Sequence, residues 1–130
     1  TWRMPACALG LHYYPSGLRR YVNRLGVQAS KRAFLLGQAQ PFEELDKLHV
    51  FAALVEADAF EATLSHLVTT LSTMAPLALT LTKKSLNEIA AGLYNEPALK
   101  ERSRQSVHSH DFAEGRAAFA ERRAPKFTGS

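Results

Sequence analysis

The spacing of hydrophobic and polar residues changes near residue 56 of this chain. Before that point, apolar residues fall into short runs separated by glycine and proline. Residues 8–14 are apolar and aromatic, which predicts a short strand or a buried loop. Residues 50–55 form six consecutive apolar positions, which predicts a buried strand.

Between these two runs the apolar positions have helical spacing. Residues 18–25 predict one helix that ends at Gly26, and residues 29–36 predict a second that ends at Gly37. Residues 42–48 are long enough for one or two helical turns. A lone strand or two cannot form a stable sheet. The front of the chain is therefore interpreted as the tail of a larger unit that contains a sheet.

After residue 56 the pattern is helical throughout. Apolar side chains repeat along one face of the first helix, at Phe60, Leu64, Leu67, Val68 and Leu71. Pro76 and Pro97 each suit the first turn of a further helix, the latter after Asn95. Asp58 with Glu61, and Asp111 with Glu114, have the spacing of capping boxes. The last helix is predicted to end near Arg123, and the chain is predicted to be mostly α.

Length and composition place the chain among ordinary globular domains. It has 130 residues, of which 46% are hydrophobic, and one cysteine. A single cysteine cannot form an internal disulfide framework or a cysteine-based zinc site. No apolar run approaches the roughly 20 residues that span a bilayer, and the opening residues lack a secretion signal. A cytoplasmic protein without a membrane partner is therefore expected, although a chain that opens with Thr1 is also consistent with an incomplete N-terminus.

The net charge of +4 is unevenly distributed. Residues 1–42 contain six basic residues and no acid, whereas residues 43–100 are acidic overall. This asymmetry indicates either an anionic partner or simply solvated helix faces. Nucleic acid is not predicted, because no recognisable binding motif or basic cluster is present. A phosphate-bearing small molecule fits the charge equally well.

Few residues form a motif with obvious chemistry. His108, His110 and Asp111 resemble a metal-binding set, but no carboxylate-rich partner lies nearby, and Asp111 is better interpreted as a helix cap. No metal site is predicted. Cys7 has no base beside it in any motif and is interpreted as a small buried hydrophobe. Phe112 and Phe119 are typical of packing more often than of ligand contact.

Five blocks of the sequence, in order, resemble a known family. The first three are a Pro5-to-Gly10 segment at the position of a Pro-Glu-x-x-x-Gly motif, a Ser16-Gly17 loop followed by Arg20, and Leu35-Leu36-Gly37. The fourth is Ala75-Pro76 ahead of Lys83 and Leu86-Asn87. The fifth and most specific comprises Asp111, Glu114-Gly115, Ala118-Phe119, Arg122-Arg123 and Phe127. From residue 4 to residue 127 the chain resembles the C-terminal half of the crotonase superfamily, the enoyl-CoA hydratase/isomerase proteins.

This resemblance implies a fold and a division of the chain. Residues 1–56 would be the last turn of a spiral of ββα units, and residues 57–130 a helical oligomerisation region. A homotrimer or a dimer of trimers, hence a hexamer, would be the assembly. The first half of the family's fold, with the oxyanion-hole donors and the first catalytic carboxylate, would lie outside this chain.

The resemblance also implies chemistry on a CoA thioester, as a lyase or isomerase of fatty acid metabolism that needs no cofactor. Two backbone N–H groups would stabilise an enolate while acidic or basic side chains move protons. The second hydratase glutamate aligns with Ala6, in the acyl pocket, so two-glutamate hydration is not expected. No catalytic residue is identifiable in this chain. The alternative is a non-catalytic assembly module or a degraded paralogue.

One binding feature is carried over by the resemblance. Phe119 and Arg122 align with residues of the last helix that lie near the CoA of a neighbouring subunit. A guanidinium suits phosphate, and a phenyl ring can stack on adenine. The alternative is that Phe119 is buried in the core and Arg122 is solvated.

Overall fold

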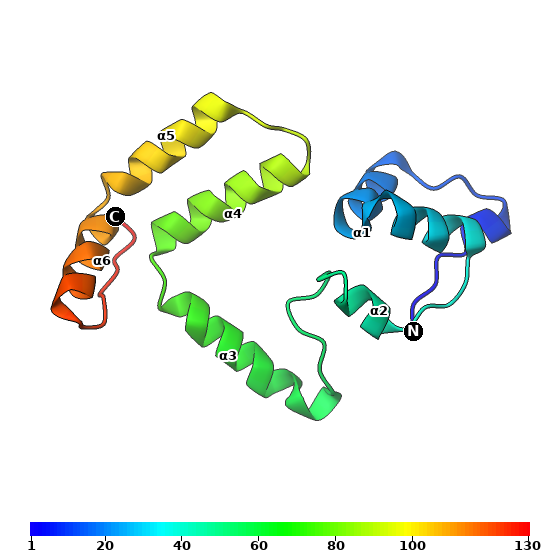
Figure 1. The fold of residues 1–130 in the computed structure, drawn as a ribbon, viewed down its shortest axis with the longest axis horizontal. Coiled ribbons are helices and arrows are strands. Elements are labelled where there is room, and N and C mark those ends of the chain that lie inside the picture. The colour runs from blue at the N-terminus through cyan, green and yellow to red at the C-terminus, as the bar shows by residue number, and fades with distance from the viewer. The chain divides into compact units, whose positions relative to one another are not determined.

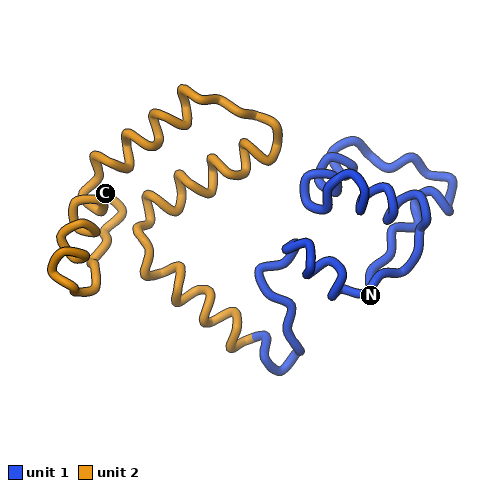
Figure 2. The backbone as a smooth tube through the Cα atoms, viewed as in Figure 1, with its two compact units in different colours: residues 1–60 blue, residues 61–130 orange.

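The computed structural model describes residues 1–130 as helices joined by loops, with no β-strand. The helices fall into two compact units, Thr1–Phe60 and Glu61–Ser130 (Figure 2). Extended backbone pairs at a single antiparallel bridge, between Trp2 and Gln40. The mostly helical fold class is therefore confirmed, whereas the short strands expected at the front are absent.

The first unit is built around α1 (Pro15–Leu36), with α2 (Phe42–Asp46) and two short 3₁₀ turns, η1 (Cys7–Leu9) and η2 (Ala57–Ala59). Gly26 interrupts α1 with a φ of 78°, and Gly37 ends it with a φ of 59°. Both values lie in the left-handed region that glycine adopts without steric cost. The two predicted helices are thus confirmed, joined through a bend at Gly26 (Figure 1).

An aromatic core holds the first unit together. The Phe34 ring contacts two tyrosine rings, with centroid distances of 5.3 Å to Tyr13 and 5.0 Å to Tyr21. Such tilted and edge-to-face pairs are favourable for aromatic quadrupoles. The buried members of this core are Met4, Ala6, Ala33 and Phe34, and the half-buried side chains packed on them are Trp2, Tyr13, Leu18 and Tyr21.

The two runs predicted as strand or buried loop have a different structure. Residues 8–14 enter the η1 turn and then an open loop in which Leu9 and Leu11 are exposed. Residues 50–55 form a bend and a loop, with Leu54 and Val55 exposed. Both strand predictions were wrong for the same physical reason. A strand must pair its backbone N–H and C=O groups with a neighbouring strand, and this chain supplies none.

The second unit consists of α3 (Phe60–Ser72), α4 (Pro76–Ala90), α5 (Glu96–Val107) and α6 (His110–Glu121). Helices α4 and α5 lie side by side, and α6 packs at the end of α5 (Figure 1). Arg102 of α5 binds two groups of α4, Ser85 Oγ at 3.0 Å and Glu88 at 2.7 Å. This partly buried ion pair lowers the pKa of Glu88, because Arg102 donates hydrogen bonds to its ionised form.

The helix caps of the second unit agree only partly with the predictions. Asn95 caps α5 by accepting the N–H of Ala98 at 3.0 Å, as expected. Asp58 forms no cap, because it lies inside the η2 turn. Asp111 is not the cap of α6, since Ser109 accepts the N–H of Phe112 at 3.0 Å. The predicted cap lies two residues too late, and Asp111 is left free for another role.

No single helix of the chain is long and apolar enough to cross a membrane. The segments Ala57–Ser72 and Pro76–Ala90 reach that length and composition only as a pair, and they are bent by 109° at the break between them.

Candidate functional site

The C-terminal tail folds back along α6 because Asp111 binds it. The Asp111 carboxylate is 2% exposed and accepts two backbone N–H groups, from Thr128 at 2.7 Å and from Gly129 at 2.9 Å. The Asp111 N–H donates in turn to the carbonyl of Ser130 at 3.0 Å. A buried carboxylate with two N–H donors is fully satisfied. Asp111 therefore holds the tail, and its side chain is not available for catalysis.

A second carboxylate fastens the bend between α6 and the tail. Glu114 accepts hydrogen bonds from Arg123 Nη2 at 2.8 Å and from the Lys126 N–H at 2.7 Å. These bonds stabilise the charged form, so Arg123 first and the Lys126 N–H second lower the pKa of Glu114 to about 2. The pKa of Arg123 is raised by the same pair and by Glu121. Glu114 remains ionised at neutral pH and is a poor proton donor.

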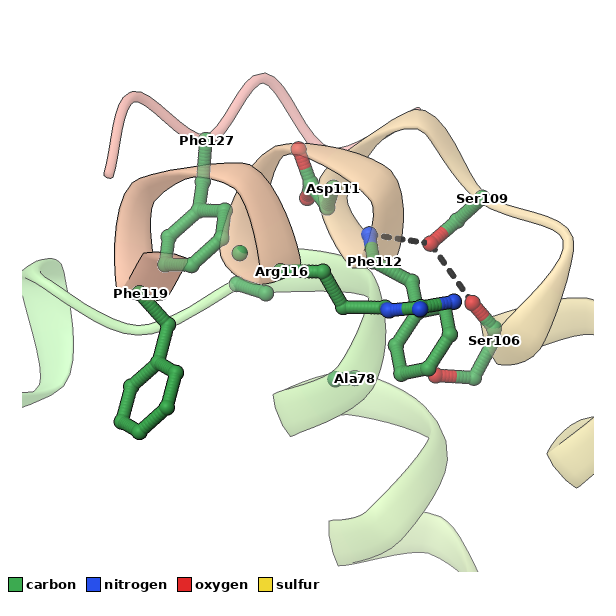
Figure 3. A pocket seen from close by; sticks show the side chains of 10 residues that line it. Ala78, Ser106, Ser109, Asp111, Phe112, Arg116, Phe119 and Phe127 are labelled. Atoms are coloured by element: carbon green, nitrogen blue, oxygen red, sulfur yellow. Dashed lines mark hydrogen bonds between the residues drawn. The ribbon is translucent and has the colours of Figure 1, made fainter. Parts of the chain in front are cut away.

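The folded tail forms one wall of a cavity of about 470 Å³ in the second unit. Phe127 lies over Gly115, where an added Cβ would meet the Phe127 ring at 3.5 Å. The Arg116 guanidinium lies 5.9 Å from the centroid of the Phe112 ring, a cation–π distance (Figure 3). The lining residues are Ala75, Ala78, Ser106, Ser109, Asp111, Phe112, Gly115, Arg116, Phe119 and Phe127.

The chemistry of this cavity is that of a binding surface. Three phenyl rings and one guanidinium suit a flat apolar group with a nearby negative charge. Its one carboxylate, Asp111, is occupied by the tail. The lining therefore contains no group placed to transfer a proton to a ligand.

The structure places both residues predicted to contact CoA at the end of α6. Phe119 lines the cavity, is 88% exposed and projects away from α6 (Figure 3). It is not buried in a core within this chain. Arg122 is the C-cap of α6, with a φ of 54°, and is exposed. Its guanidinium forms no hydrogen bond or ion pair, whereas that of neighbouring Arg123 is held by Glu114 and Glu121.

The remaining candidates lie in different places. Ala6 is 4% exposed and belongs to the aromatic core of the first unit. Cys7 is exposed, so its interpretation as a buried hydrophobe was wrong. It begins the short η1 turn, whose side chains are not buried. His108 and His110 join no group of three or more potential metal ligands.

Sequence reasoning missed two residues of the cavity wall, Arg116 and Phe127. Both were visible as members of patterns, Arg116 on the helical face of Phe112 and Phe119, and Phe127 in the final family block. Neither pattern indicated a cavity. The tail folds back along α6 because Asp111 accepts hydrogen bonds from backbone N–H groups that are 17 and 18 residues away in the sequence.

Comparison with known proteins identifies the family. The family model described as enoyl-CoA hydratase/isomerase matches residues 2–130. A Mycobacterium bovis protein named "probable enoyl-CoA hydratase" is 28% identical over 126 residues, which cover 95% of this chain and 49% of that protein. The chain thus spans about half the length of the curated relatives it matches.

Solved structures agree with this match. A probable enoyl-CoA hydratase/isomerase of Mycobacterium abscessus is 30% identical with a TM-score of 0.80, covering 98% of this chain and 52% of that one. Enoyl-CoA hydratase of Mycobacterium tuberculosis is 28% identical with a TM-score of 0.79, covering 97% and 51%. From its sequence over nearly its full length and from its fold, the chain belongs to the enoyl-CoA hydratase/isomerase family.

Proposed function

We propose that this chain is the C-terminal part of a crotonase-like enzyme that acts on an acyl-CoA thioester. The observation that carries the proposal is the family match over residues 2–130, at about half the length of the relatives. In this proposal residues 1–56 complete the spiral core and residues 57–130 form the helical oligomerisation region. No cofactor is required, because the CoA thioester itself is the activated substrate.

The proposed reaction proceeds through an enolate stabilised by two backbone N–H groups supplied from outside this chain. Such donors act where the charge develops, on the thioester oxygen. At Ala6, the position of the second hydratase glutamate, a methyl group cannot transfer a proton. Residues 1–42 contain no acid that could replace it. In place of two-glutamate hydration we therefore propose an isomerisation, or a lyase reaction of the superfamily other than hydration, with its catalytic groups elsewhere. Ala6 lines the acyl pocket in this proposal.

For CoA binding we propose Phe119 and Arg122, which act on the thioester bound by a neighbouring subunit. The exposed Phe119 ring can stack on adenine, and Arg122 has no protein partner that competes with a phosphate. Apolar side chains of α3, namely Leu64, Val68 and Leu71, are exposed along one face. Such a face supports assembly with further copies, as a homotrimer or dimer of trimers.

The test of CoA binding compares two arginines of the second unit in the full-length protein. Arg122→Gln is expected to weaken binding of crotonyl-CoA about tenfold, the effect of one charge-assisted contact to phosphate. Arg104→Gln is the matched control, since Arg104 is exposed and already paired with Glu101 at 2.6 Å. Isothermal titration calorimetry measures both affinities. Equal affinities for the two variants would remove Arg122 from the CoA site.

The competing candidate is a non-catalytic assembly module, favoured by the missing acid at Ala6 and by the exposed face of α3. It predicts trimers or hexamers by native mass spectrometry, without turnover of any enoyl-CoA. Hydration or isomerisation measured from the ultraviolet absorbance of the enoyl thioester would eliminate this candidate. Oligomers that bind CoA thioesters but leave them unchanged would eliminate the enzyme.

A further inference from the structure

The first unit contains a cavity whose lining includes neither of the residues proposed to contact CoA, Phe119 and Arg122. It measures about 320 Å³ and lies among the start of the chain, the first half of α1, α2 and the loop after α2. Small-molecule sites occupy roughly 300 to 1,000 Å³, so this cavity is at the lower end of their range. Its lining residues are Trp2, Arg20, Tyr21, Arg24, Leu25, Phe42, Leu45, Val50 and Phe51.

Four aromatic rings form the walls of this cavity. Trp2 and Tyr21 are stacked with their centroids 6.0 Å apart, and Phe42 and Phe51 meet edge to face at 6.3 Å. Leu25, Leu45 and Val50 supply the remaining apolar surface. Aromatic and aliphatic walls favour a flat or branched apolar group over a strongly hydrated one.

Two guanidiniums give the cavity its charge. Arg20 and Arg24 are four residues apart and therefore lie on one face of α1. Both are exposed, and neither forms a hydrogen bond or an ion pair. The acidic residues of α2 do not line the cavity, and Glu44 is occupied by Lys47 at 2.6 Å. The rim thus has two cations that lack an anionic partner.

From this juxtaposition we propose that the cavity is an accessory binding site for a small amphipathic anion, a molecule with a flat apolar body and one carboxylate or phosphate group. The apolar body lies between the aromatic walls, and the anionic group binds Arg20 and Arg24 at the rim. Arginine suits both headgroups because its planar fork matches carboxylate and phosphate geometry.

The experiment uses three probes on the full-length protein. The first is 2-naphthoate, the second is 2-naphthylmethanol, which has the same ring system without the charge, and the third is inorganic phosphate, which has the charge without the ring system. Calorimetry is expected to show 2-naphthoate binding about tenfold more tightly than either of the others. Equal affinity for the neutral alcohol would overturn the role of the arginines. Equal affinity for phosphate would overturn the role of the apolar walls.

Variants locate the binding within the chain. Arg20→Gln and Arg24→Gln are each expected to weaken 2-naphthoate binding about fivefold to tenfold, with 2-naphthylmethanol unchanged. Arg19→Gln is the matched control, because Arg19 is exposed on the same helix but does not line the cavity. If Arg19→Gln weakened 2-naphthoate binding as much as Arg20→Gln, the effect would come from the overall positive charge of α1 and the proposed site would be overturned.

A measurement without substitution gives a second decision. The indole N–H resonance of Trp2 is expected to shift when 2-naphthoate is added, because the Trp2 ring forms one wall. A Trp2 resonance that stays unchanged at saturating probe would overturn the proposal. Crotonyl-CoA binding is also measured in Arg20→Gln and Arg24→Gln and is expected to be unchanged. Failure of the accessory site can therefore be told apart from failure of the proposed acyl-CoA function.

Discussion

Each of the two units of this protein is stabilised internally by a different kind of interaction. In Thr1–Phe60, aromatic and aliphatic side chains are buried around Phe34. In Glu61–Ser130, the buried residues are Asp111 and Ala118, and the elements are joined by hydrogen-bonded carboxylates and guanidiniums. The second unit leaves most of its large apolar side chains exposed.

This difference shows what each unit requires from its surroundings. Buried apolar surface stabilises a unit by itself, at about 25 cal/mol per Å² removed from water. Directional polar bonds fix the geometry of helices but contribute less net stability each. A unit that relies on polar bonds and exposes leucine and phenylalanine is suited to cover those side chains by association. The proposed oligomerisation region has this property, and the first unit has it to a lesser degree.

The largest effect expected from this comparison is on Phe34→Ala, which removes the centre of the aromatic core. Truncating a buried phenylalanine costs about 3–5 kcal/mol of unfolding free energy, because contacts are lost and a cavity remains. Urea unfolding followed by the fluorescence of Trp2, the chain's one tryptophan, measures the first unit. Leu35→Ala is the matched control on the same helix, at a 68% exposed position, where a change within about 0.5 kcal/mol is expected. Similar losses for both variants would contradict a first unit held together by its buried aromatic core.

The next largest effect is on Asp111→Ala, which leaves the Thr128 and Gly129 N–H groups without an acceptor. Loss of hydrogen bonds to a charged group costs about 1.5–3 kcal/mol, here expressed as release of the tail from α6. Hydrogen exchange at the two amides is expected to accelerate strongly, while exchange in α1 stays unchanged. Unaltered exchange at Thr128 and Gly129 would show that other contacts hold the tail.

A smaller effect is expected from removing the helix cap at Ser109. Ser109→Ala deprives the Phe112 N–H of its acceptor and costs about 1 kcal/mol. Thermal unfolding followed by circular dichroism measures the change. Ser72→Ala is the control, since Ser72 lies at the end of α3 and caps no helix start. Equal effects at the two serines would remove the special role of the cap.

The smallest effect concerns acid, because the Glu114–Arg123 pair is partly open to solvent and is screened by salt. The folded state lowers the pKa of Glu114 from about 4.5 to about 2. This carboxylate therefore adds stability above about pH 4.5, and its contribution is lost as the pH falls through about 2. The Lys126 amide resonance is expected to titrate with a midpoint near pH 2, and not to do so in Glu114→Gln. A midpoint near pH 4.5 would show that Glu114 does not accept the hydrogen bonds of Arg123 and the Lys126 N–H in solution.

Helix positions were predictable because local signals determine them. Pro15 and Pro76 begin helices, Gly37 ends one and Asn95 caps another, each through contacts within a few residues. The five blocks that resemble the family could also be recognised from the sequence, because each is a pattern of residues close together in the chain. The cap of α6 was misassigned since Ser109 and Asp111 are both good capping residues, and only the folded chain shows which one accepts the Phe112 N–H.

The sequence alone determined the helical fold class, the break in helical backbone at Gly26 and the resemblance to a family of acyl-CoA enzymes. Tertiary structure decided what depends on residues far apart in the chain. It placed residues 50–55 in an open loop for want of a pairing strand, and it turned Asp111 into the anchor of a tail 17 residues away. It also left Arg122 unpaired beside a fully engaged Arg123. Local patterns reflect backbone preferences, whereas burial and charge pairing depend on which distant groups meet when the chain folds.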